Sequence, residues 1–364
     1  MTASRKDTNF KTGLYMLAVL CALIFVGSKI DWISSLFVSD VVNYGDLYPE
    51  LTVRYFKVER VHNVHRRFPA NEDTRAADAD ILLIGDSFLD YDGETYTCAD
   101  EFSKALGQSI YVIHGGDPQR YVAAALEREK IPRDSKRRKL ILECVERNFM
   151  YLYRHGAPSP STGGSSASTA SSVVNLAREI SHTWFTDSER RYQYLLNTSV
   201  LTSGFIEAVS TMKFREFGMM PKRFPVYSLH PPMVFSYFET NPNSPTSYFY
   251  PHTQEDIEAI AVHLKELSEW LSLDWNLDLV VLPIPNKITI YHKLATDVSY
   301  DDYLPRLIAE LRRQGVPTVD LYTPFRQAEG RIYYSTDTHW NPRGVDLATQ
   351  VVAGQLGDAG TSDH

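Results

Sequence analysis

The stretch Ile-Leu-Leu-Ile-Gly-Asp-Ser at residues 81–87 is a short, continuous apolar run that ends at a glycine and two polar residues. An apolar run of this length, bounded by turn residues, predicts a buried parallel strand that leads into a turn. Similar runs follow at residues 110–113, 140–142 and 279–282. Strands, turns and helices alternate between them, and this alternation favours an α/β fold with a central parallel sheet.

Two helix starts can be predicted in the last third of the chain, near residues 253 and 341. Thr253 and Asp256 approximate a capping box, which predicts a helix from about residue 253. Its expected buried face consists of Ile257, Ile260, Ala261, Leu264 and Leu271. Asn341 can cap a second helix whose first turn holds Pro342. A further strand is predicted at residues 317–321, in the same alternating order.

The N-terminal segment decides the cellular compartment. Residues 12–28 carry no charge, and residues 14–26 are almost wholly apolar, which is at the short end of membrane-spanning length. Arg5, Lys6 and Lys11 precede this segment, and positive charge on that flank favours a cytoplasmic N-terminus with export of the rest. We therefore predict a single-pass inner-membrane protein with a periplasmic or extracytoplasmic catalytic domain. A cleaved signal peptide is the alternative.

The predicted organisation has four parts. Residues 1–11 form a cytoplasmic tail, residues 12–28 the membrane anchor, residues 29–78 a stem, and residues 79–364 the catalytic domain. Within that domain, residues 155–251 are interpreted as a flexible loop followed by a partly helical insertion. The loop is placed at residues 157–172 because Ser, Thr, Gly, Pro and Ala dominate there and bury little apolar surface.

Composition excludes some classes of partner and of site. The formal net charge of -8 provides no basic footprint for a phosphate backbone, so nucleic acid is not an expected partner. The 22 tyrosines would suit a surface that stacks on sugar rings. Cys98 and Cys144 are the two cysteines beyond the apolar N-terminal run, and a buried thiol at Cys144 is favoured over a disulfide between them. No His or Cys grouping has zinc spacing, so neither a metal nor a cofactor is expected.

Three residues carry the proposed chemistry. Ser87 follows a predicted strand, at the carboxyl edge where open α/β sheets place their ligands. A serine hydroxyl needs a base to become nucleophilic, and the base needs an acid that fixes its tautomer. Asp337 and His339 can fill these roles, because a turn between them would bring the carboxylate to the imidazole. Each motif alone is weak, and the combination predicts a serine triad.

Four sequence blocks give this prediction a family context. They are residues 84–88 (Ile-Gly-Asp-Ser-Phe), 142–149 (Leu-Glu-Cys-Val-Glu-Arg-Asn-Phe), 282–287 (Leu-Pro-Ile-Pro-Asn-Lys) and 337–340 (Asp-Thr-His-Trp), the last followed by Gly344. In these blocks the chain resembles the SGNH hydrolase-like acetyltransferases that O-acetylate exopolysaccharides, among them the periplasmic alginate O-acetylation proteins. The resemblance implies a three-layer SGNH domain in which Ser87 takes the acyl group, His339 is the general base and Asp337 orients it.

The oxyanion donors depart from the family pattern. Ordinary SGNH esterases supply an asparagine from a Gly-x-Asn-Asp block, which this chain lacks, and Asn286 is a possible substitute. The backbone N–H groups of Ser87 and of Gly115 or Gly116 are the other candidates, because such donors can face the developing negative oxygen.

Further polar residues follow the predicted strands and are candidates for substrate contact. Glu143, Glu146 and Arg147 follow one strand, and Arg147 is either part of the site or paired with a neighbouring carboxylate. Lys287 and Tyr291 are candidates for contact with sugar hydroxyls or carboxylates, with a solvated lysine as the alternative.

Three functions are consistent with these residues. The first is transfer of an acetyl group through an acyl-serine to hydroxyls of an exported polysaccharide, with an integral-membrane acyltransferase as the acetyl donor that the resemblance implies. The second is a carbohydrate acetyl-esterase, since the same triad serves water as acceptor. The third is a polysaccharide-binding scaffold without catalysis, against which the complete Ser, Asp and His set argues.

Overall fold

The computed structural model describes residues 53–56, 75–89, 97–113, 119–133, 136–155 and 203–357, together with Thr12, Tyr15, Met16 and Val19. The chain divides into two compact units. Unit 1 comprises Met1–Val58 with Ser165–Pro221, and unit 2 comprises Glu59–Gly164 with Lys222–His364. The predicted loop at 157–172 and most of the stem lie outside the described residues.

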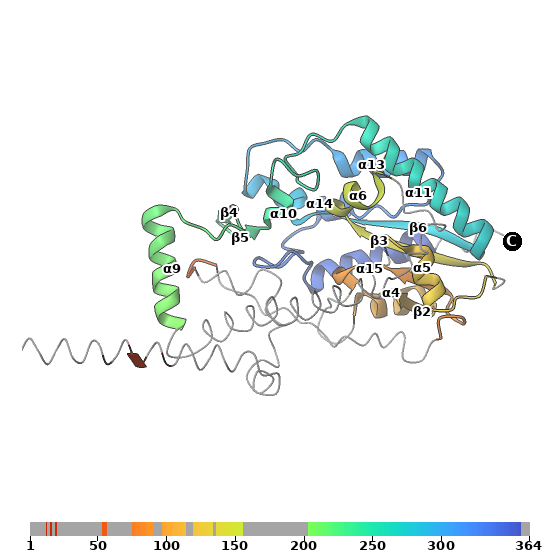
Figure 1. The fold of residues 1–364 in the computed structure, drawn as a ribbon, viewed down its shortest axis with the longest axis horizontal. Helices are drawn as coiled ribbons and strands as arrows, with labels where there is room; N and C mark the ends of the chain where they lie inside the picture. Colours follow the sequence, from red (N-terminus) through yellow and green to blue (C-terminus); the bar gives the residue numbers. More distant parts are fainter. Residues whose placement is uncertain are drawn as a thin grey trace, which may run out of the picture. The chain divides into compact units, whose positions relative to one another are not determined.

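Unit 2 is built on a four-stranded parallel sheet (Figure 1). Its strands are β1 (Ile81–Ile84), β2 (Ile110–Ile113), β3 (Arg138–Val145) and β6 (Leu277–Ile284), in the order β2-β1-β3-β6. In register, Ile84 of β1 lies opposite Ile113 on one side and Leu142 on the other. The predicted α/β class with a central parallel sheet is confirmed. All carboxyl ends of the strands therefore share one edge.

Helices cover both faces of the sheet, because successive side chains of each buried strand point to opposite sides. Ile81 and Leu83 pack in a core with α4 (Cys98–Leu106) and α15 (Pro342–Gly357). Leu82 and Ile84 pack on the other side. The helices in that second core are α5 (Val122–Arg128), α6 (Glu146–Tyr153), α11 (Gln254–Trp275) and α13 (Tyr303–Arg313). The result is three layers, in which each fully buried aliphatic side chain contributes roughly 1.5–3 kcal/mol.

The two predicted helix starts are confirmed. Thr253 caps α11 with the reciprocal hydrogen bonds of a capping box to Asp256, and all five residues of the expected apolar face are buried. The Oδ1 atom of Asn341 accepts the Gly344 N–H at 3.1 Å, so Asn341 caps α15. Local side-chain to backbone bonds of this kind are readable from sequence, since both partners lie within three residues.

The predicted strand at 317–321 is reduced to a single parallel bridge, in which the Val281 N–H donates to the Pro317 carbonyl and the Val319 N–H to the Val281 carbonyl, both at 2.9 Å. Only Thr318 bridges β6, opposite Val281, and α14 (Tyr322–Gln327) begins directly afterwards. The segment starts at Pro317, which has no N–H to donate, so the ladder does not extend before this residue. Cys98 and Cys144 are both buried, and they belong to the cores on opposite faces of the sheet.

Residues 222–251, the last part of the segment interpreted as a partly helical insertion, form a small substructure of unit 2. An antiparallel hairpin joins β4 (Val226–Leu229) to β5 (Pro232–Phe235), and the short helix α10 (Tyr237–Thr240) follows. The Val234 N–H donates to the Ser335 carbonyl at 3.0 Å, which ties the hairpin to the loop that carries Asp337.

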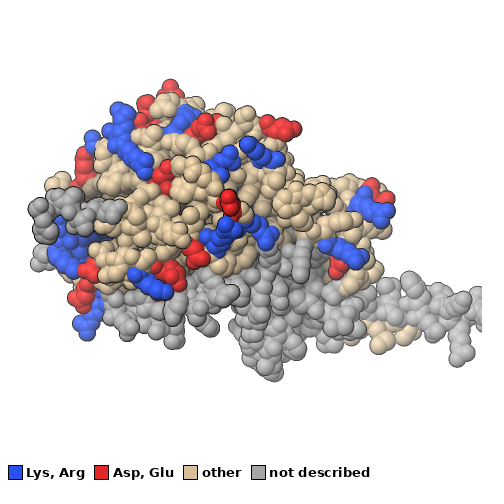
Figure 2. Space-filling model, turned by 180° about the vertical axis from the view of Figure 1, so that it is seen from behind, with Lys and Arg blue, Asp and Glu red and all other residues tan. Residues whose placement is uncertain are grey.

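In unit 1 the structure describes residues 53–56 and 203–221, besides the four N-terminal residues named above. The helix α9 (Ser203–Phe217) packs its Phe214 ring against Tyr55 and Phe56, and the Arg54 N–H donates to Thr211 Oγ1 at 3.0 Å. Among the residues placed in the structure, no helix has the length and apolar character needed to span a membrane. The predicted anchor at 12–28 falls almost entirely outside those residues, so the anchor stays a prediction. On the described surface in Figure 2, basic and acidic side chains are interspersed.

Candidate active site

Ser87 stands on a tight turn at the carboxyl end of β1. It begins a short 3-10 helix, η2 (Ser87–Leu89), and its side chain is exposed. The Phe88 N–H donates to Asp86 Oδ1 at 3.1 Å, and the Asp86 N–H donates to Glu143 Oε2 at 2.7 Å. A Cβ atom on Gly85 would overlap that Glu143 oxygen, so only glycine fits below the turn. The turn is thus held from below by a buried carboxyl group.

The loop before α15 brings a histidine and an aspartate to this serine. The Ser87 Oγ lies 2.7 Å from His339 Nε2, although 252 residues separate the two. His339 Nδ1 lies 2.5 Å from Asp337 Oδ1, and the same oxygen accepts the His339 N–H at 2.7 Å. Asp337 is fully buried and His339 is 3% exposed. An imidazole placed between a hydroxyl and a carboxylate is the arrangement that activates a serine.

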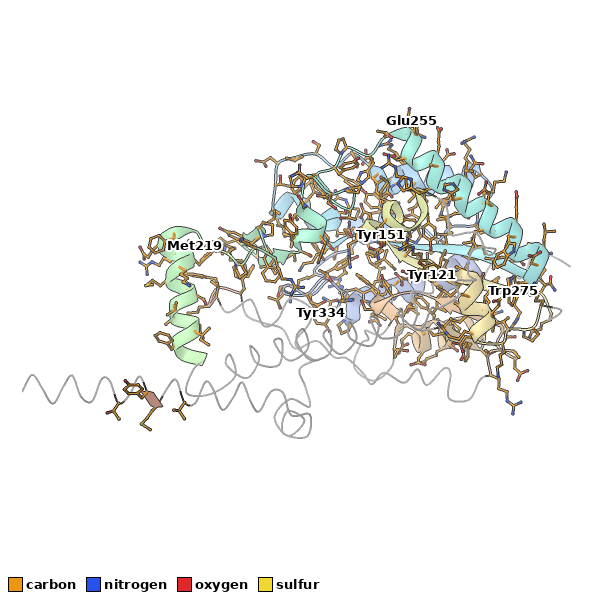
Figure 3. All side chains as sticks on the ribbon, viewed as in Figure 1. Tyr121, Tyr151, Met219, Glu255, Trp275 and Tyr334 are labelled. Carbon is orange, nitrogen blue, oxygen red and sulfur yellow. The ribbon has the colours of Figure 1, made fainter. Side chains whose placement is uncertain are left out.

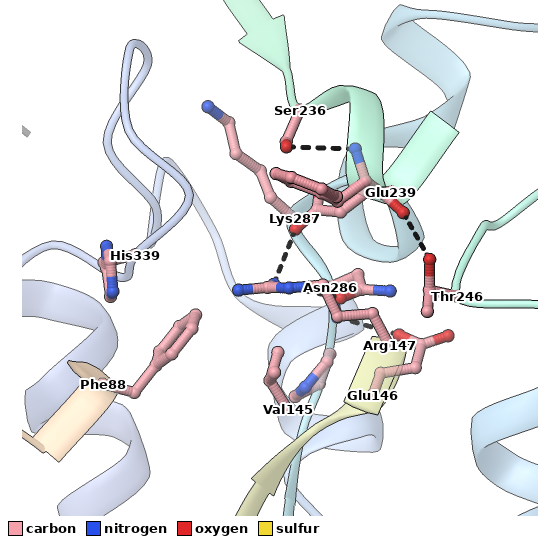
Figure 4. A network of polar contacts seen from close by, with 12 residues as sticks. Phe88, Val145, Glu146, Arg147, Ser236, Glu239, Thr246, Asn286, Lys287 and His339 are labelled. Atoms are coloured by element: carbon pink, nitrogen blue, oxygen red, sulfur yellow. Dashed lines mark hydrogen bonds and ion pairs between the residues drawn. The ribbon is translucent and has the colours of Figure 1, made fainter. Parts of the chain in front are cut away.

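Aromatic packing fixes the plane of the imidazole. The Phe88 and His339 ring centroids are 4.6 Å apart (Figure 4). Phe88 also meets Trp340 edge to face, with the ring centroids 5.3 Å apart. The Trp340 Nε1–H donates to the Phe88 carbonyl at 3.1 Å. Because this bond joins the serine turn to the histidine loop, the two halves of the triad are held together independently of the triad contacts.

The sequence makes Lys287 a candidate for contact with a sugar, whereas the structure places its side chain in the interior. Its side chain is fully buried at the start of α12 (Lys287–Tyr291), so it is not solvated either. Its Nζ donates to the carbonyls of Ser335 and Asp337, both at 2.9 Å, and lies 5.6 Å from the centroid of the Phe235 ring. Lys287 therefore supports the backbone of the Asp337 loop.

Arg147 and Asn286 meet at the carboxyl ends of β3 and β6. The Arg147 Nη1 donates to Glu239 Oε1 at 3.0 Å and to Asn286 Oδ1 at 3.4 Å (Figure 4). Glu239 is fully buried, whereas the Arg147 side chain is 18% exposed. Arg147 therefore pairs with a carboxylate, as one of the two alternatives has it, at the same edge of the sheet as Ser87. Its part in the site stays a prediction. Sequence reasoning missed Glu239, because no motif marks α10.

Two buried glutamates, Glu143 and Glu146, lie close to Arg147 and Asn286. Glu146 accepts the Asn286 N–H at 2.8 Å and the Tyr300 hydroxyl at 2.5 Å. Burial raises the pKa of Glu146 to about 7, against the lowering effect of these hydrogen bonds. Burial likewise raises the pKa of Glu143 well above its usual range, and the nearby Asp86 charge adds to the shift.

The remaining candidates are placed as follows. The Tyr291 hydroxyl accepts the Ile332 N–H at 2.8 Å, so this group is bonded to backbone. Gly115 and Gly116 lie outside the described residues. Directly after that gap, the Gln119 Nε2 donates to the Glu143 carbonyl at 2.5 Å, a contact that sequence gave no reason to expect.

Comparison with known proteins supports the family predicted from the four blocks. Residues 246–363 match a family model described as SGNH hydrolase-like domain, acetyltransferase AlgX. The chain is 33% identical over 81 residues to a protein of Pseudomonas putida named "Probable alginate O-acetylase AlgJ". That alignment covers 21% of this chain and 21% of the relative, so the chain spans about a fifth of the relative's length. No solved structure matches significantly.

The suspected resemblance to the SGNH hydrolase-like acetyltransferases is thereby confirmed for the C-terminal part of the chain. The family match includes Asp337, His339 and Lys287, whereas Ser87 and Arg147 precede it. The place of Ser87 in the site consequently rests on the geometry of unit 2.

Proposed function

We propose that this protein is an O-acetyltransferase that moves an acetyl group through an acyl-Ser87 intermediate to hydroxyls of an exported polysaccharide. The observation that carries the proposal is the 2.7 Å contact between Ser87 Oγ and His339 Nε2, with Asp337 on the far side of the imidazole. The match to the AlgX acetyltransferase model supports acetyl chemistry. The name of the AlgJ relative supports a polysaccharide as acceptor.

The proposed first half-reaction acylates the serine. Ser87 Oγ attacks the carbonyl carbon of the acetyl donor, and its proton passes to His339 Nε2. Asp337 accepts the Nδ1–H and stabilises the imidazolium. When the tetrahedral intermediate collapses, the bond from carbon to the leaving group breaks, and His339 returns the proton to that group.

The second half-reaction runs in the opposite sense. A sugar hydroxyl of the acceptor gives its proton to His339 Nε2 and attacks the acetyl-Ser87 carbonyl. The ester bond to Ser87 Oγ breaks, and the protonated imidazole restores the serine hydroxyl.

Asn286 and the backbone N–H of Ser87 are the proposed oxyanion donors among the described residues. Arg147 binds Asn286 Oδ1, which directs the NH₂ end of the amide away from the guanidinium. Glu146 fixes the backbone of Asn286 through its N–H. Preorganised donors of this kind lower the barrier because they need no reorientation as charge develops on the oxygen. The N–H groups of Gly115 and Gly116 remain proposed donors too.

The proposed setting is the outer face of the inner membrane. A membrane anchor at residues 12–28 would hold the enzyme beside an integral-membrane acyltransferase that supplies the acetyl group. Tethering raises the effective concentration of enzyme at the point where the acyl group emerges.

Mass spectrometry of Ser87 tests the proposal. The full-length protein is incubated with p-nitrophenyl acetate, quenched with acid and digested, in parallel with Ser87→Ala and His339→Ala. We expect an acetyl adduct on the peptide that contains Ser87 in the wild type, and none in either variant. An adduct of equal yield in His339→Ala, or one located on another residue, would rule out the triad mechanism.

A carbohydrate acetyl-esterase is the second candidate, because the exposed Ser87 side chain is accessible to water. The two functions differ in the acceptor of the second half-reaction. Release of acetate and acetylation of an added oligosaccharide are measured together. A transferase diverts acetyl groups to the sugar as its concentration rises, whereas an esterase releases acetate at a rate that the sugar does not change.

A further inference from the structure

An arginine lies between two exposed tyrosine rings on unit 2. The Arg120 guanidinium carbon is 5.5 Å from the ring centroid of Tyr121 and 5.4 Å from that of Tyr151. The Arg120 Nη1 also donates to the Tyr151 hydroxyl at 3.1 Å. Tyr121 is 42% exposed and Tyr151 is 63% exposed. Figure 3 shows the two tyrosines near one another, and we term Arg120, Tyr121 and Tyr151 the tyrosine platform.

The platform is held in place before any ligand arrives. A cation over an exposed aromatic ring is worth about 0.5–1 kcal/mol, and here a single guanidinium contacts two rings. The contact with Tyr151 joins residues 31 positions apart, so it is a tertiary contact and not a consequence of sequence adjacency. Rings that are already ordered lose little conformational entropy when a ligand stacks on them.

Hydrogen bonds connect the platform to the catalytic edge. Gln119, which precedes Arg120, donates to the carbonyl of Glu143, and the carboxyl of Glu143 accepts the Asp86 N–H beside Ser87. Tyr121 directly precedes α5, at the end of the connection that leaves the carboxyl end of β2.

The helix α6 provides a second link to the site. Tyr151 lies four residues after Arg147, and positions four apart occupy one face of a helix about one turn apart. Burial agrees, since Phe149, Met150, Leu152 and Tyr153 are buried, whereas Arg147, Asn148 and Tyr151 are not. Helical side chains lean toward the helix N-terminus, so the Tyr151 ring leans toward Arg147 and the carboxyl edge of the sheet.

The chemistry of the platform fits a sugar chain. Flat aromatic faces pack against the C–H faces of pyranose rings, and the phenol and guanidinium groups at their edges bond to hydroxyl or carboxylate groups. The exposed neighbours on α5 are Ala124, Glu127 and Arg128, so no large aliphatic side chain of that helix lies beside the rings. A protein interface normally has an apolar, fully desolvated centre, which such a neighbourhood does not provide.

We propose that the tyrosine platform is a subsite for the acceptor polysaccharide, and that it binds sugar units next to the one that receives the acetyl group. This inference rests on the proposed function, because it assumes a carbohydrate acceptor for acyl-Ser87. The platform determines how the chain lies across the edge of the sheet, and thus which hydroxyl reaches the serine.

The experiment compares single variants of the full-length protein. Tyr121→Ala and Tyr151→Ala are assayed with p-nitrophenyl acetate as donor and with two acceptors of equal length, a mannuronate oligosaccharide and a neutral cello-oligosaccharide. We expect KM for the preferred acceptor to rise about ten-fold or more in each variant while kcat changes little, because each substitution removes an aromatic face on which a sugar ring packs. Tyr151→Phe keeps the ring and retains most of the affinity. Phe217→Ala, which removes a 70% exposed ring of unit 1, serves as the matched control.

Direct binding separates this inference from the proposed function. Ser87→Ala is titrated with the same oligosaccharides by calorimetry, and we expect normal binding without transfer. If Tyr121→Ala and Tyr151→Ala bind and use both acceptors as the wild type does, the platform is no sugar subsite, even when Ser87→Ala is inactive. A defect that arises only when a membrane partner supplies the acetyl group would also overturn the inference and would indicate a protein-docking surface. If Ser87→Ala still transfers acetyl groups, the proposed function fails, while loss of binding in the platform variants would still establish a sugar site.

Discussion

The two ends of the parallel sheet differ in how deeply most of their ionisable side chains are buried. At the carboxyl end, Glu143, Glu146 and Lys287 are each at most 3% exposed. At the amino end, the ion pairs Lys136–Asp80 and Arg137–Asp278 lie at the surface, with side chains 39–65% exposed. Exposed pairs contribute about 0–1 kcal/mol, whereas burying a charge costs several kcal/mol unless partners compensate.

This contrast indicates at which end of the sheet ionisable side chains are buried despite the free-energy cost of removing them from water. The carboxyl end keeps groups that an ordinary hydrophobic core would replace, and each has specific hydrogen-bond partners around the triad. Perturbed ionisable groups concentrate at functional sites, because chemistry needs charge in a place with little water. At the amino end the ion-paired side chains of Asp80, Lys136, Arg137 and Asp278 remain partly solvated. Arg138 is the exception, since it is 3% exposed and donates to the Ala76 carbonyl at 2.8 Å.

A cavity at the amino end of the sheet does not coincide with the triad. A cavity of about 660 Å³ lies at the amino end, with charged lining residues that include Arg137, Lys139, Glu269 and Asp278. None of these four side chains is buried. Since β6 has eight residues, its two ends are roughly 23 Å apart, so this cavity lies well away from the triad. A cavity by itself is therefore a weaker guide to the site than buried ionisable groups.

The largest difference between the two ends is expected in catalysis. Asp337→Asn keeps the shape of the side chain but no longer stabilises the imidazolium or the correct tautomer of His339. We expect acetyl transfer to fall by about 10³–10⁴-fold, with an unchanged circular dichroism spectrum. Asp278→Asn makes the same chemical change at the amino end and should leave transfer within about two-fold. Equal losses in the two variants would mean that the distinction between the ends has no catalytic meaning.

Substitutions at the two ends should also differ in their effect on the free energy of unfolding, although less than in their effect on catalysis. Lys287→Met removes the hydrogen bonds from a buried ammonium group to the Ser335 and Asp337 carbonyls, although the Ser335 carbonyl keeps the bond from the Val234 N–H. We expect the free energy of unfolding in urea to fall by about 2–4 kcal/mol. Arg137→Met breaks an exposed pair and should cost less than about 1 kcal/mol. If the two substitutions cost the same, Lys287 is not the support of the loop that the geometry suggests.

Sequence reasoning succeeded where the signal was local. The four apolar runs, the capping box at Thr253 and the Asn341 cap each involve residues close together in the chain, and each is found in the structure. Ser87, Asp337 and His339 were chosen for chemistry at predicted strand and helix ends, and the parallel topology brings them to one edge.

The supporting contacts were not readable, because their partners come from distant segments. Glu239 lies in a region with no recognisable periodicity, 92 residues after the arginine that it binds. Lys287 follows a proline-rich turn, where a solvated lysine is the common outcome, and only the fold places its ammonium group under the Asp337 loop. Burial of a polar residue depends on what packs over it, which a local pattern does not encode.

Glu146 should give the carboxyl end a pH dependence of stability. Its folded pKa of about 7 exceeds the ordinary value of 4.5, so the unfolded chain ionises first as pH rises. The stability contribution is therefore fully present below about pH 4.5 and is lost as pH rises to about 7, by an amount on the order of 3 kcal/mol. In Glu146→Gln the difference in unfolding free energy between pH 5 and pH 8 should shrink. If the variant kept the full wild-type difference, another group would be responsible.

The smallest expected effect belongs to the amino end. Asp80 accepts hydrogen bonds from Lys136 Nζ at 2.8 Å and from Ser109 Oγ at 2.7 Å, and these bonds lower its pKa to about 2. This lowered pKa contributes stability above about pH 3.8 that is lost as pH falls toward 2, and solvent screening keeps it small. Lys136→Ala should raise the pKa of Asp80 in an NMR titration and cost less than about 1 kcal/mol at low salt. At about 1 M salt the cost should vanish, because surface charges are screened within a few ångströms. A loss above about 2 kcal/mol that persisted in salt would show that charge at this end is as important to the fold as charge beside the triad.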